Sequence, residues 1–274
     1  MRIAVTADLH YDPSSDYLTP PYRVEALVLE MLADEPDAVI IAGDLAHGLE
    51  LFSDCLACFR DVGVPVGVVI GNHDLWRDEK GGYSSADLWE TLLPQAVERA
   101  GAIWLERDTL RIGDVAVVGS AVWYDYSAID PAFALPLADI VEFKSQIHAD
   151  AYWIDWERTD REFAGDLKKG FDERLAQSRA DSTIRAVLCV THVPIFEEQI
   201  MRKPHDKFWG ISNAYFGNLT AGRVVLAEPK VRAVVSGHTH IGRQATLVRD
   251  GMPPIECHVV ASDYGAPAYL TIKL

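Results

Sequence analysis

The chain has 274 residues, of which 49% are apolar and 24% are charged, a composition typical of a globular protein with a substantial core. Its formal net charge of −16 argues against a general binder of nucleic acid or of anionic membranes. The apolar run at the start is too short for a signal peptide, and no segment reaches the ~18 apolar residues of a membrane span, so we expect a cytoplasmic protein.

The first part of the chain alternates predicted strands and helices. Three apolar runs predict buried strands, at residues 3–7, 38–42 and 66–70. The first two are separated by a helical pattern, for which Thr19 is the expected N-cap. A second amphipathic helix is predicted at residues 49–62. This order predicts parallel strands joined by right-handed crossovers.

The rest of the chain is less regular. A helix is predicted at residues 84–100, followed by short strands at 102–105, 109–112 and 115–120. The two short turns between these strands suggest hairpins, so we expect the sheet to become antiparallel here. Further strands are expected at residues 185–190, 232–235, 256–261 and 268–273. We expect one domain over residues 1–274, with residues 123–180 forming an elaboration over the strand ends.

Two of the four cysteines, Cys55 and Cys58, form a Cys-x-x-Cys pair. Such a pair can be a redox motif or half of a zinc site. It lies inside a helical apolar pattern and no second pair is nearby, so we interpret both cysteines as small buried hydrophobic residues.

Five predicted strands end in residues that can bind metal ions. These endings are Asp8-x-His10, Gly43-Asp44, Gly71-Asn72-His73-Asp74, His192 and Gly237-His238-x-His240. Imidazole and carboxylate together suit first-row divalent metals, and the absence of cysteine argues against a structural zinc site. A single histidine at a strand end is more often an ordinary hydrogen-bonded residue. The hypothesis of metal binding therefore depends on the agreement of all five strand endings. Seven ligands exceed the need of one tetrahedral ion and suit two ions that share a carboxylate.

As a set, the motifs D-x-H, G-D, G-N-H-[DE], a lone His and G-H-x-H resemble those of the calcineurin-like metallophosphoesterases, and here they extend from Asp8 to His240. The resemblance implies an α/β (α+β) fold, a four-layer αββα sandwich with metals at the C-terminal strand ends. It also implies that Asp8, His10 and His240 hold one metal, that Asn72, His192 and His238 hold the other, and that Asp44 bridges them. His73 would be the catalytic histidine near the leaving-group oxygen, with Asp74 orienting its imidazole.

The resemblance further implies two divalent transition-metal ions, with Mn, Fe or Zn as candidates, and a metal-bridging hydroxide that attacks phosphorus. We expect a small phosphodiester or nucleotide-like substrate. A phosphomonoesterase and a nuclease are alternatives on the same site. A metal-dependent binding module without catalysis is an alternative of another class, although the ligands and the catalytic histidine are all present.

Two branches of the family fit poorly. Protein Ser/Thr phosphatases carry G-D-x-x-D-R-G, whereas Asp44 is followed here by Leu45, Ala46 and His47. Purple acid phosphatases carry a tyrosine three residues after the bridging aspartate, and this chain has His47 there. An iron–tyrosinate site is therefore excluded on residue type.

Candidate substrate contacts follow the ligand motifs. His47 is one, although it could equally face solvent at the start of a helix. The aromatic side chains of Trp76, Trp123, Tyr124 and Trp209 could stack on a base or an aryl group, or simply pack loops onto the sandwich. Arg202 could bind a second phosphate, or belong to an exposed basic stretch.

Overall fold

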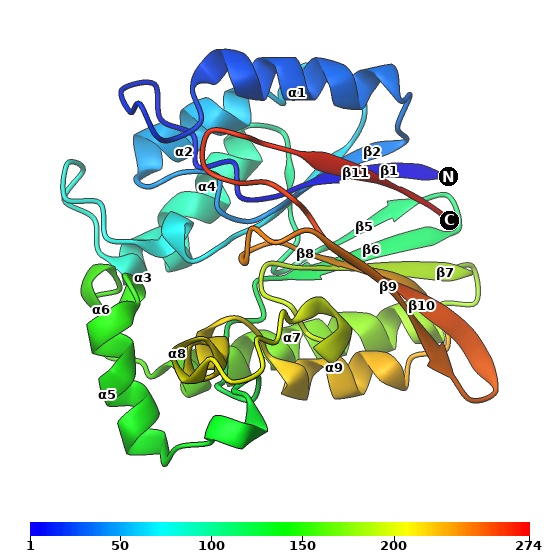
Figure 1. Ribbon diagram of the computed structural model, residues 1–274. Helices are drawn as coiled ribbons and strands as arrows, with labels where there is room; N and C mark the ends of the chain where they lie inside the picture. The colour runs from blue at the N-terminus through cyan, green and yellow to red at the C-terminus, as the bar shows by residue number, and fades with distance from the viewer.

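Two β-sheets lie face to face between two layers of helices in the computed structural model, which describes residues 1–274 (Figure 1). The inner faces of the sheets and the helices that cover them share one cluster of 70 buried apolar residues. This is the four-layer αββα sandwich of α/β class that the motifs imply, so the expected fold is confirmed.

The first sheet has five strands in the spatial order β11-β1-β2-β3-β4. Their bounds are β1 (Arg2–Thr6), β2 (Ala38–Ala42), β3 (Val66–Val69), β4 (Ile103–Trp104) and β11 (Tyr269–Lys273). Strands β1 to β4 run parallel, and β11 pairs antiparallel with β1. The predicted parallel strands of the first part of the chain are therefore confirmed.

The second sheet has six strands in the order β5-β6-β7-β8-β10-β9. Their bounds are β5 (Thr109–Ile112), β6 (Val115–Ser120), β7 (Ala186–Thr191), β8 (Val231–Ser236), β9 (Arg243–Arg249) and β10 (Met252–Val259). The four central strands are parallel, and only the outer strands β5 and β9 are antiparallel to their neighbours. The expected change to an antiparallel sheet is therefore wrong except at the edges.

Helices cover the outer faces of both sheets (Figure 1). On the first sheet lie α1 (Pro21–Ala33), α2 (Leu49–Ala57), α3 (Ser85–Asp87), the π-helical turn η2 (Leu88–Leu92) and α4 (Leu93–Arg99). The remaining helices are α5 (Leu137–Ile147), α6 (Asp150–Trp153), α7 (Asp160–Ala180), α8 (Lys207–Ser212) and α9 (Leu219–Leu226). Single 3₁₀ turns are η1 (His73–Leu75), η3 (Pro131–Phe133), η4 (Glu197–Gln199) and η5 (Asn213–Tyr215).

Three helix boundaries differ from the prediction. Pro20, not Thr19, occupies the N-cap of α1, and the Thr19 hydroxyl is buried without a partner. Helix α2 ends at Ala57 because the next residues tighten into i→i+3 hydrogen bonds before the chain turns at Gly63. The helix predicted at 84–100 contains the wide turn η2 just before Pro94, whose ring would clash with a regular helical carbonyl.

The turn after β4 is not a hairpin. Strand β4 belongs to the first sheet and β5 to the second, so the chain crosses between the sheets at this point. Leu105 makes the crossing: a Cβ added at Gly67 or at Gly119 would lie 2.8 and 2.7 Å, respectively, from its side chain, so it fills the space between the sheets. The predicted β5–β6 hairpin is confirmed, whereas β9 was not predicted.

Residues 123–180, called the insert below, follow β6 and contain α5, α6 and α7. Helix α7 packs along β6, while α5 and α6 extend beside the strand ends at the lower left of Figure 1. All four cysteines are free. Cys55 is buried in α2 as expected, whereas Cys58 at the end of that helix is only partly buried, so the interpretation as a buried residue is wrong for Cys58. None of the helices has both the length and the apolar composition needed to span a bilayer.

Candidate metal centre

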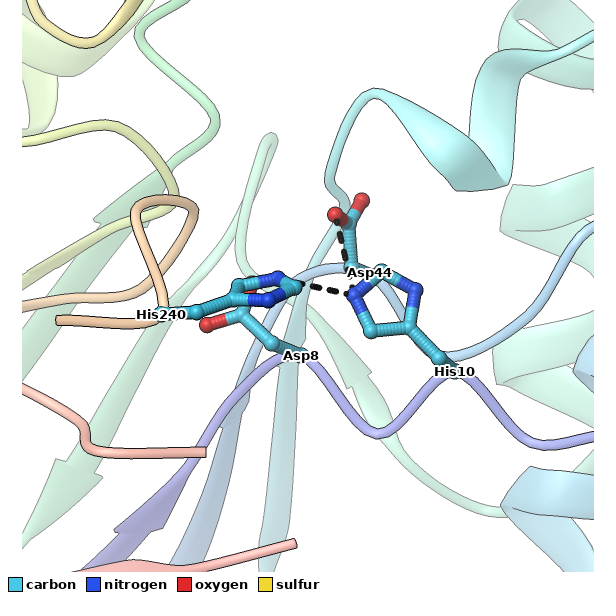
Figure 2. A group of neighbouring side chains, drawn as sticks. All are labelled: Asp8, His10, Asp44 and His240. Atoms are coloured by element: carbon cyan, nitrogen blue, oxygen red, sulfur yellow. Dashed lines mark hydrogen bonds and ion pairs between the residues drawn. The ribbon is translucent and has the colours of Figure 1, made fainter. Parts of the chain in front are cut away.

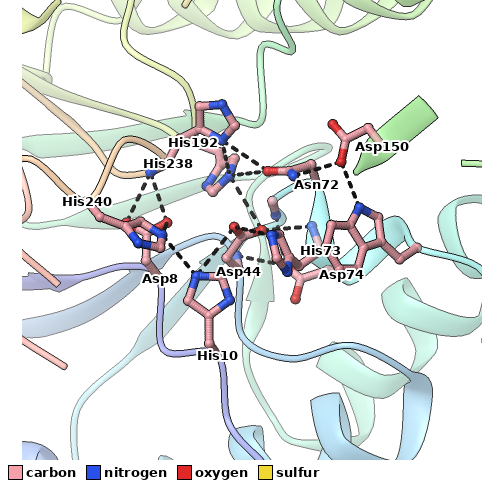
Figure 3. Close-up of polar contacts among 12 residues, drawn as sticks. Asp8, His10, Asp44, Asn72, His73, Asp74, Asp150, His192, His238 and His240 are labelled. Carbon is pink, nitrogen blue, oxygen red and sulfur yellow. Dashed lines mark hydrogen bonds and ion pairs between the residues drawn. The ribbon is translucent and has the colours of Figure 1, made fainter. Parts of the chain in front are cut away.

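The five polar strand endings meet at one edge of the sandwich. Strands β1, β2 and β3 of the first sheet and β7 and β8 of the second are followed directly by the candidate ligands. Within each sheet these strands are parallel neighbours, so their C-terminal ends lie on the same side. The structure thus brings together all seven side chains named as metal ligands from the sequence (Figure 3).

Tight backbone bends aim these side chains inward. Asp8, His10, Asp44, His238 and His240 all have positive φ, between 44° and 70°. Since β1 ends at Thr6, Asp8 and His10 face the same site through these left-handed bends and not through strand alternation. Aspartate and histidine tolerate this conformation better than β-branched residues do.

Glycines let the loops approach closely. A Cβ added at Gly71 would lie 2.1 Å from Oδ1 of Asp44 and 2.6 Å from the ring of His192. A Cβ at Gly43, where φ is +93°, would lie 2.3 Å from Nδ1 of the same histidine. The glycines at positions 43 and 71 therefore leave the space that the side chains of Asp44 and His192 occupy.

The first donor cluster consists of Asp8, His10, Asp44 and His240 (Figure 2). The Nε2 atoms of His10 and His240 are 3.0 Å apart, and Nε2 of His10 is 3.8 Å from Oδ2 of Asp44. Nε2 of His240 is 3.9 Å from Oδ1 of Asp8, and its Nδ1 donates to Asp263 at 3.2 Å. That outer hydrogen bond places the proton on Nδ1 and leaves the Nε2 lone pair facing the cluster.

The second donor cluster consists of Asn72, His192 and His238, with Asp44 shared between the two clusters. Oδ1 of Asn72 lies 3.0 Å from Nε2 of His192 and 3.0 Å from Nδ1 of His238. The two ring nitrogens are 3.2 Å apart, and Nε2 of His192 is 3.5 Å from Oδ1 of Asp44. Figure 3 shows these atoms pointing toward one point.

The protons of the second cluster all point outward. Nδ1 of His192 donates to the carbonyl of Ala42 at 2.9 Å, and Nε2 of His238 donates to the carbonyl of Tyr215 at 2.9 Å. The amide nitrogen of Asn72 donates to a carboxylate behind it at 2.9 Å. Three lone pairs therefore face one another within 3.2 Å without a proton between them. Ligands about 2.1 Å from one ion lie about 3.0 Å apart when they are adjacent, so the arrangement fits a metal ion.

Burial shifts the pKa values of both clusters in the same sense. It raises the pKa of Asp8 and Asp44 well above the usual carboxyl value, and neighbouring carboxylates add to the rise. It lowers the pKa of His10 and His192 well below the imidazole value and that of His238 to about 4, with repulsion from other histidines contributing. Neutral imidazoles beside carboxylates that lack a counter-charge are the groups that a divalent cation binds.

His73 and Asp74 follow Asn72 but occupy different positions. The His73 ring stacks on Trp76 with centroids 3.7 Å apart, and its Nε2 lies 4.0 Å from Oδ2 of Asp44. The expected contact between Asp74 and this imidazole is absent, so that prediction is wrong. Burial raises the pKa of the Asp74 carboxyl to about 7 against the lowering effect of four backbone donors. These N–H groups, which tie the loops after β2 and β3 together, belong to Gly71, Asp44, Leu45 and Ala46.

A cavity of about 290 Å³ opens beside the donor atoms. Besides the ligand candidates, its lining includes the polar or aromatic side chains of His73, Trp76, His148, Phe216, Thr239 and Tyr264. Oγ1 of Thr239 is buried and has no partner in the protein. No lysine or arginine lines this cavity, so positive charge in it would come from bound metal or from a protonated histidine.

Only two of the six predicted substrate contacts lie near this cavity. Trp76 lines it directly. His47 lies one aromatic layer behind, with its ring 5.3 Å from that of Trp76 and its Nε2 3.1 Å from the Arg77 carbonyl. It lines two adjoining cavities instead.

The other four candidates do not reach the cavity, because each is held by protein contacts. Trp123 and Tyr124 are buried, and donate to Asp160 and to Asp150 at 2.8 and 2.7 Å, respectively. Arg202 makes two hydrogen bonds of 2.7 Å to the Glu197 carboxylate. Trp209 donates to the Met201 carbonyl at 2.7 Å. These residues pack and tie loops, and none of the four lines the cavity beside the donor atoms.

Sequence reasoning missed four residues around the site. Asp150 accepts the Asn72 amide, His148 and Tyr264 line the cavity, and Asp263 holds His240. Asp150 and His148 come from the insert, whose irregular sequence pattern does not predict where its side chains lie relative to the strand ends. Asp263 and Tyr264 follow β10 in a loop without a motif.

Comparison with known proteins agrees with this geometry. The family model for calcineurin-like phosphoesterases matches residues 1–242. No curated protein sequence matches the chain. Among solved structures, phosphopantetheinyl hydrolase from Mycobacterium tuberculosis is similar with a TM-score of 0.69 and 20% identity, over 96% of this chain and 90% of that one. A dimetal phosphatase from Danio rerio has a TM-score of 0.59 and 15% identity, over 100% and 92% of the two chains.

A purple acid phosphatase from yellow lupin (Lupinus luteus) seeds is also similar, with a TM-score of 0.52 and 12% identity, over 100% of this chain and 45% of that chain. At these identities the structural likeness shows the fold. The family model, which spans every motif from Asp8 to His240, shows more. The chain belongs to the calcineurin-like phosphoesterase family, and its donor clusters fit the divalent metal ions on which such hydrolases depend.

Proposed function

We propose that the protein hydrolyses a small phosphodiester with two divalent transition-metal ions, for which Mn, Fe and Zn are the candidates. One observation carries the proposal: two clusters of inward-facing donor atoms share the carboxylate of Asp44. Asp8, His10 and His240 would hold one ion, and Asn72, His192 and His238 the other.

Two such ions, when bound, supply an activated water and positive charge for the phosphoryl oxygens. The protein contributes His73, whose ring edge lines the cavity beside Asp44. Burial and neighbouring histidines lower the pKa of His73 well below its usual value, and a negatively charged phosphoester beside it would raise that pKa again. His73 can then donate a proton or a hydrogen bond to the departing alcohol oxygen.

The lining of the cavity favours a diester over a monoester. A diester carries one negative charge, whereas a monoester carries nearly two at neutral pH. No lysine or arginine is present to neutralise a second charge. The polar groups that remain for phosphoryl oxygens are the side chains of His148 and Tyr264.

Adjoining cavities give room for one longer alcohol group. The metal cavity shares His73, Trp76 and Tyr264 with a neighbouring cavity of about 280 Å³. That cavity shares His47 and other residues with a larger one of about 690 Å³. We infer that the leaving alcohol extends past Trp76 toward His47. Phosphopantetheinyl diesters are therefore worth assaying, since the Mycobacterium tuberculosis structure is named for that group.

A nuclease and a binding module fit less well. A nuclease needs a basic track for the polymer backbone, and the net charge is −16 with no cation at the cavity. A binding module needs no free imidazole beside the metal ligands, and His73 makes no hydrogen bond through its ring.

The test uses protein stripped with a chelator and reloaded separately with Mn²⁺, Fe²⁺ or Zn²⁺. We expect two bound ions per chain and faster turnover of bis(p-nitrophenyl) phosphate than of p-nitrophenyl phosphate. The Asp44→Asn variant, which alters the carboxylate shared by the two clusters, is the negative control and should lose both metal and activity. A preference for the monoester would favour a phosphomonoesterase, and a metal-loaded protein that hydrolyses no ester would favour the binding module.

A further inference from the structure

Asp150 is a buried carboxylate of the insert that lies directly behind the second donor cluster (Figure 3). Its Oδ1 accepts the Asn72 amide at 2.9 Å and the Trp76 indole N–H at 2.7 Å. Its Oδ2 accepts the Tyr124 hydroxyl at 2.7 Å and lies 3.4 Å from Nδ1 of His148. Three hydrogen-bond donors thus converge on the two oxygens of the Asp150 carboxylate and hold it in one orientation.

The orientation of Asn72 depends on its neighbours. An asparagine amide can present either its oxygen or its nitrogen by rotating about its last bond, and only the oxygen has a lone pair for a metal. Without metal, the rotated amide would be favoured by the cluster itself, because its N–H groups would meet the lone pairs of His192 and His238. Those ring nitrogens lie 3.0 Å from the present Oδ1.

Asp150 opposes that rotation. If Asn72 turned, its oxygen would face the Asp150 carboxylate at the present donor–acceptor distance of 2.9 Å, and two acceptors would repel. The other donors to Asp150 fix the carboxylate in place, since both Trp76 and Tyr124 are themselves packed. The amide of Asn72 is therefore held with its oxygen toward His192 and His238 even when no ion is bound.

We propose that Asp150 is a positioning residue for Asn72, and that the insert thereby sets the metal affinity of the second donor cluster. The inference rests on the proposed two-metal function. Asn72 belongs only to this cluster, and Asp150 contacts none of Asp8, His10 or His240. The effect is therefore confined to one of the two ions.

The experiment is a calorimetric metal titration of stripped protein with Mn²⁺ or Zn²⁺. Wild-type protein should bind two equivalents. Asp150→Ala should bind the first equivalent unchanged and the second about 10–100-fold more weakly, the usual effect of removing a residue that orients a ligand. Asp150→Asn keeps one acceptor oxygen, and should recover much of the loss.

Asp160→Asn is the matched control. Asp160 is the other largely buried carboxylate of the insert, bonded to Trp123, Tyr126 and Lys144, and it touches no ligand candidate. Its variant should bind both ions as the wild type does. Equal weakening in this control would overturn the proposal, because the loss would then reflect general loosening of the insert.

A double variant keeps the test decisive if Asp150→Ala does not fold. In Asn72→Asp combined with Asp150→Asn, both terminal atoms at position 72 are oxygens, so rotation no longer matters and the second ion should bind at least as tightly as in Asp150→Asn alone. Weaker binding of the second ion in the double variant than in Asp150→Asn would contradict the positioning role. Two unchanged equivalents in Asp150→Ala would overturn this inference alone, whereas fewer than two in the wild type would overturn the two-metal function as well.

Discussion

His73 lies where the donor clusters, the cavity and an aromatic stack meet. Its ring is held by Trp76 at 3.7 Å and by the edge of His10 at 4.6 Å, both between ring centroids. Neither ring nitrogen is tied to a hydrogen-bond partner within the protein, and the nearest carboxylate oxygen is 4.0 Å away. Stacking therefore fixes the ring while leaving an N–H free for substrate.

For this reason His73→Ala should keep its metal and lose turnover. General acid catalysis by a placed side chain contributes about 10²–10⁴-fold, so we expect a fall of that order in kcat. Metal content by atomic absorption and steady-state kinetics on the same preparation test this. His205→Ala, which removes an exposed histidine, is the control. Metal and activity lost in proportion would instead make His73 a ligand or a structural residue.

The sequence places the seven ligand candidates correctly at one site because each directly follows an apolar strand. Parallel strands end at a common edge, so chain position translates into spatial position. The role expected for Asp74 fails because a buried carboxylate takes the nearest backbone N–H groups, and sequence spacing does not show which these are. Arg202 lies away from the cavity for a similar reason, since the Glu197 carboxylate holds its guanidinium. Asp150 escapes prediction because it lies in an irregular insert.

The insert is fastened to the sandwich by a largely buried ion pair. Nζ of Lys144 lies 2.8 Å from each carboxylate oxygen of Asp160, and both side chains are about nine-tenths buried. The Trp123 indole and the Tyr126 hydroxyl donate to the same carboxylate. This network joins α5 and α7 to the loop after β6.

Asp160→Asn should therefore cost stability without touching the chemistry. Removing one partner of a buried pair leaves the other charge uncompensated, which typically costs about 3–5 kcal/mol. Urea unfolding followed by circular dichroism should show a loss of that size, with kcat unchanged under folding conditions. Arg185→Ala breaks an exposed pair with Asp114 and should cost under about 1 kcal/mol. Similar losses in the two variants would mean that the buried pair adds nothing special.

The segments that form strands were predicted better than the pairing of those strands within the sheets. Apolar runs reveal β1 to β3, β7 and β8 because both faces of these strands are buried. The turn after β4 was misassigned because a short turn fits a hairpin as well as a crossing between sheets. Strand β9 was missed because it is an edge strand with alternate residues exposed and few apolar side chains.

Across the whole molecule, the proposed metals join the two sheets. Asp8, Asp44 and Asn72 come from the first sheet, and His192 and His238 from the second. An ion held by both sheets opposes their separation, and it binds the folded state only. Metal at about 1,000 times its Kd stabilises a site by about 4 kcal/mol.

Chelation should accordingly lower the thermal stability of the molecule. With two sites emptied, we expect Tm to fall by on the order of 10 °C for a protein of this size. Differential scanning calorimetry with and without EDTA tests this, and added Mn²⁺ or Zn²⁺ should restore the transition. An unchanged Tm would show that the ions do not link the sheets.

The backbone enters the left-handed region at Asp8, His10, Asp44, His238 and His240. Each costs on the order of 1 kcal/mol relative to an ordinary backbone conformation. Glycine at these positions would relax the chain and delete the donor atoms in the same step. A homologue that replaced these residues with glycine would lose its activity but gain folding stability. Under selection for stability alone, we therefore expect these five positions to change first.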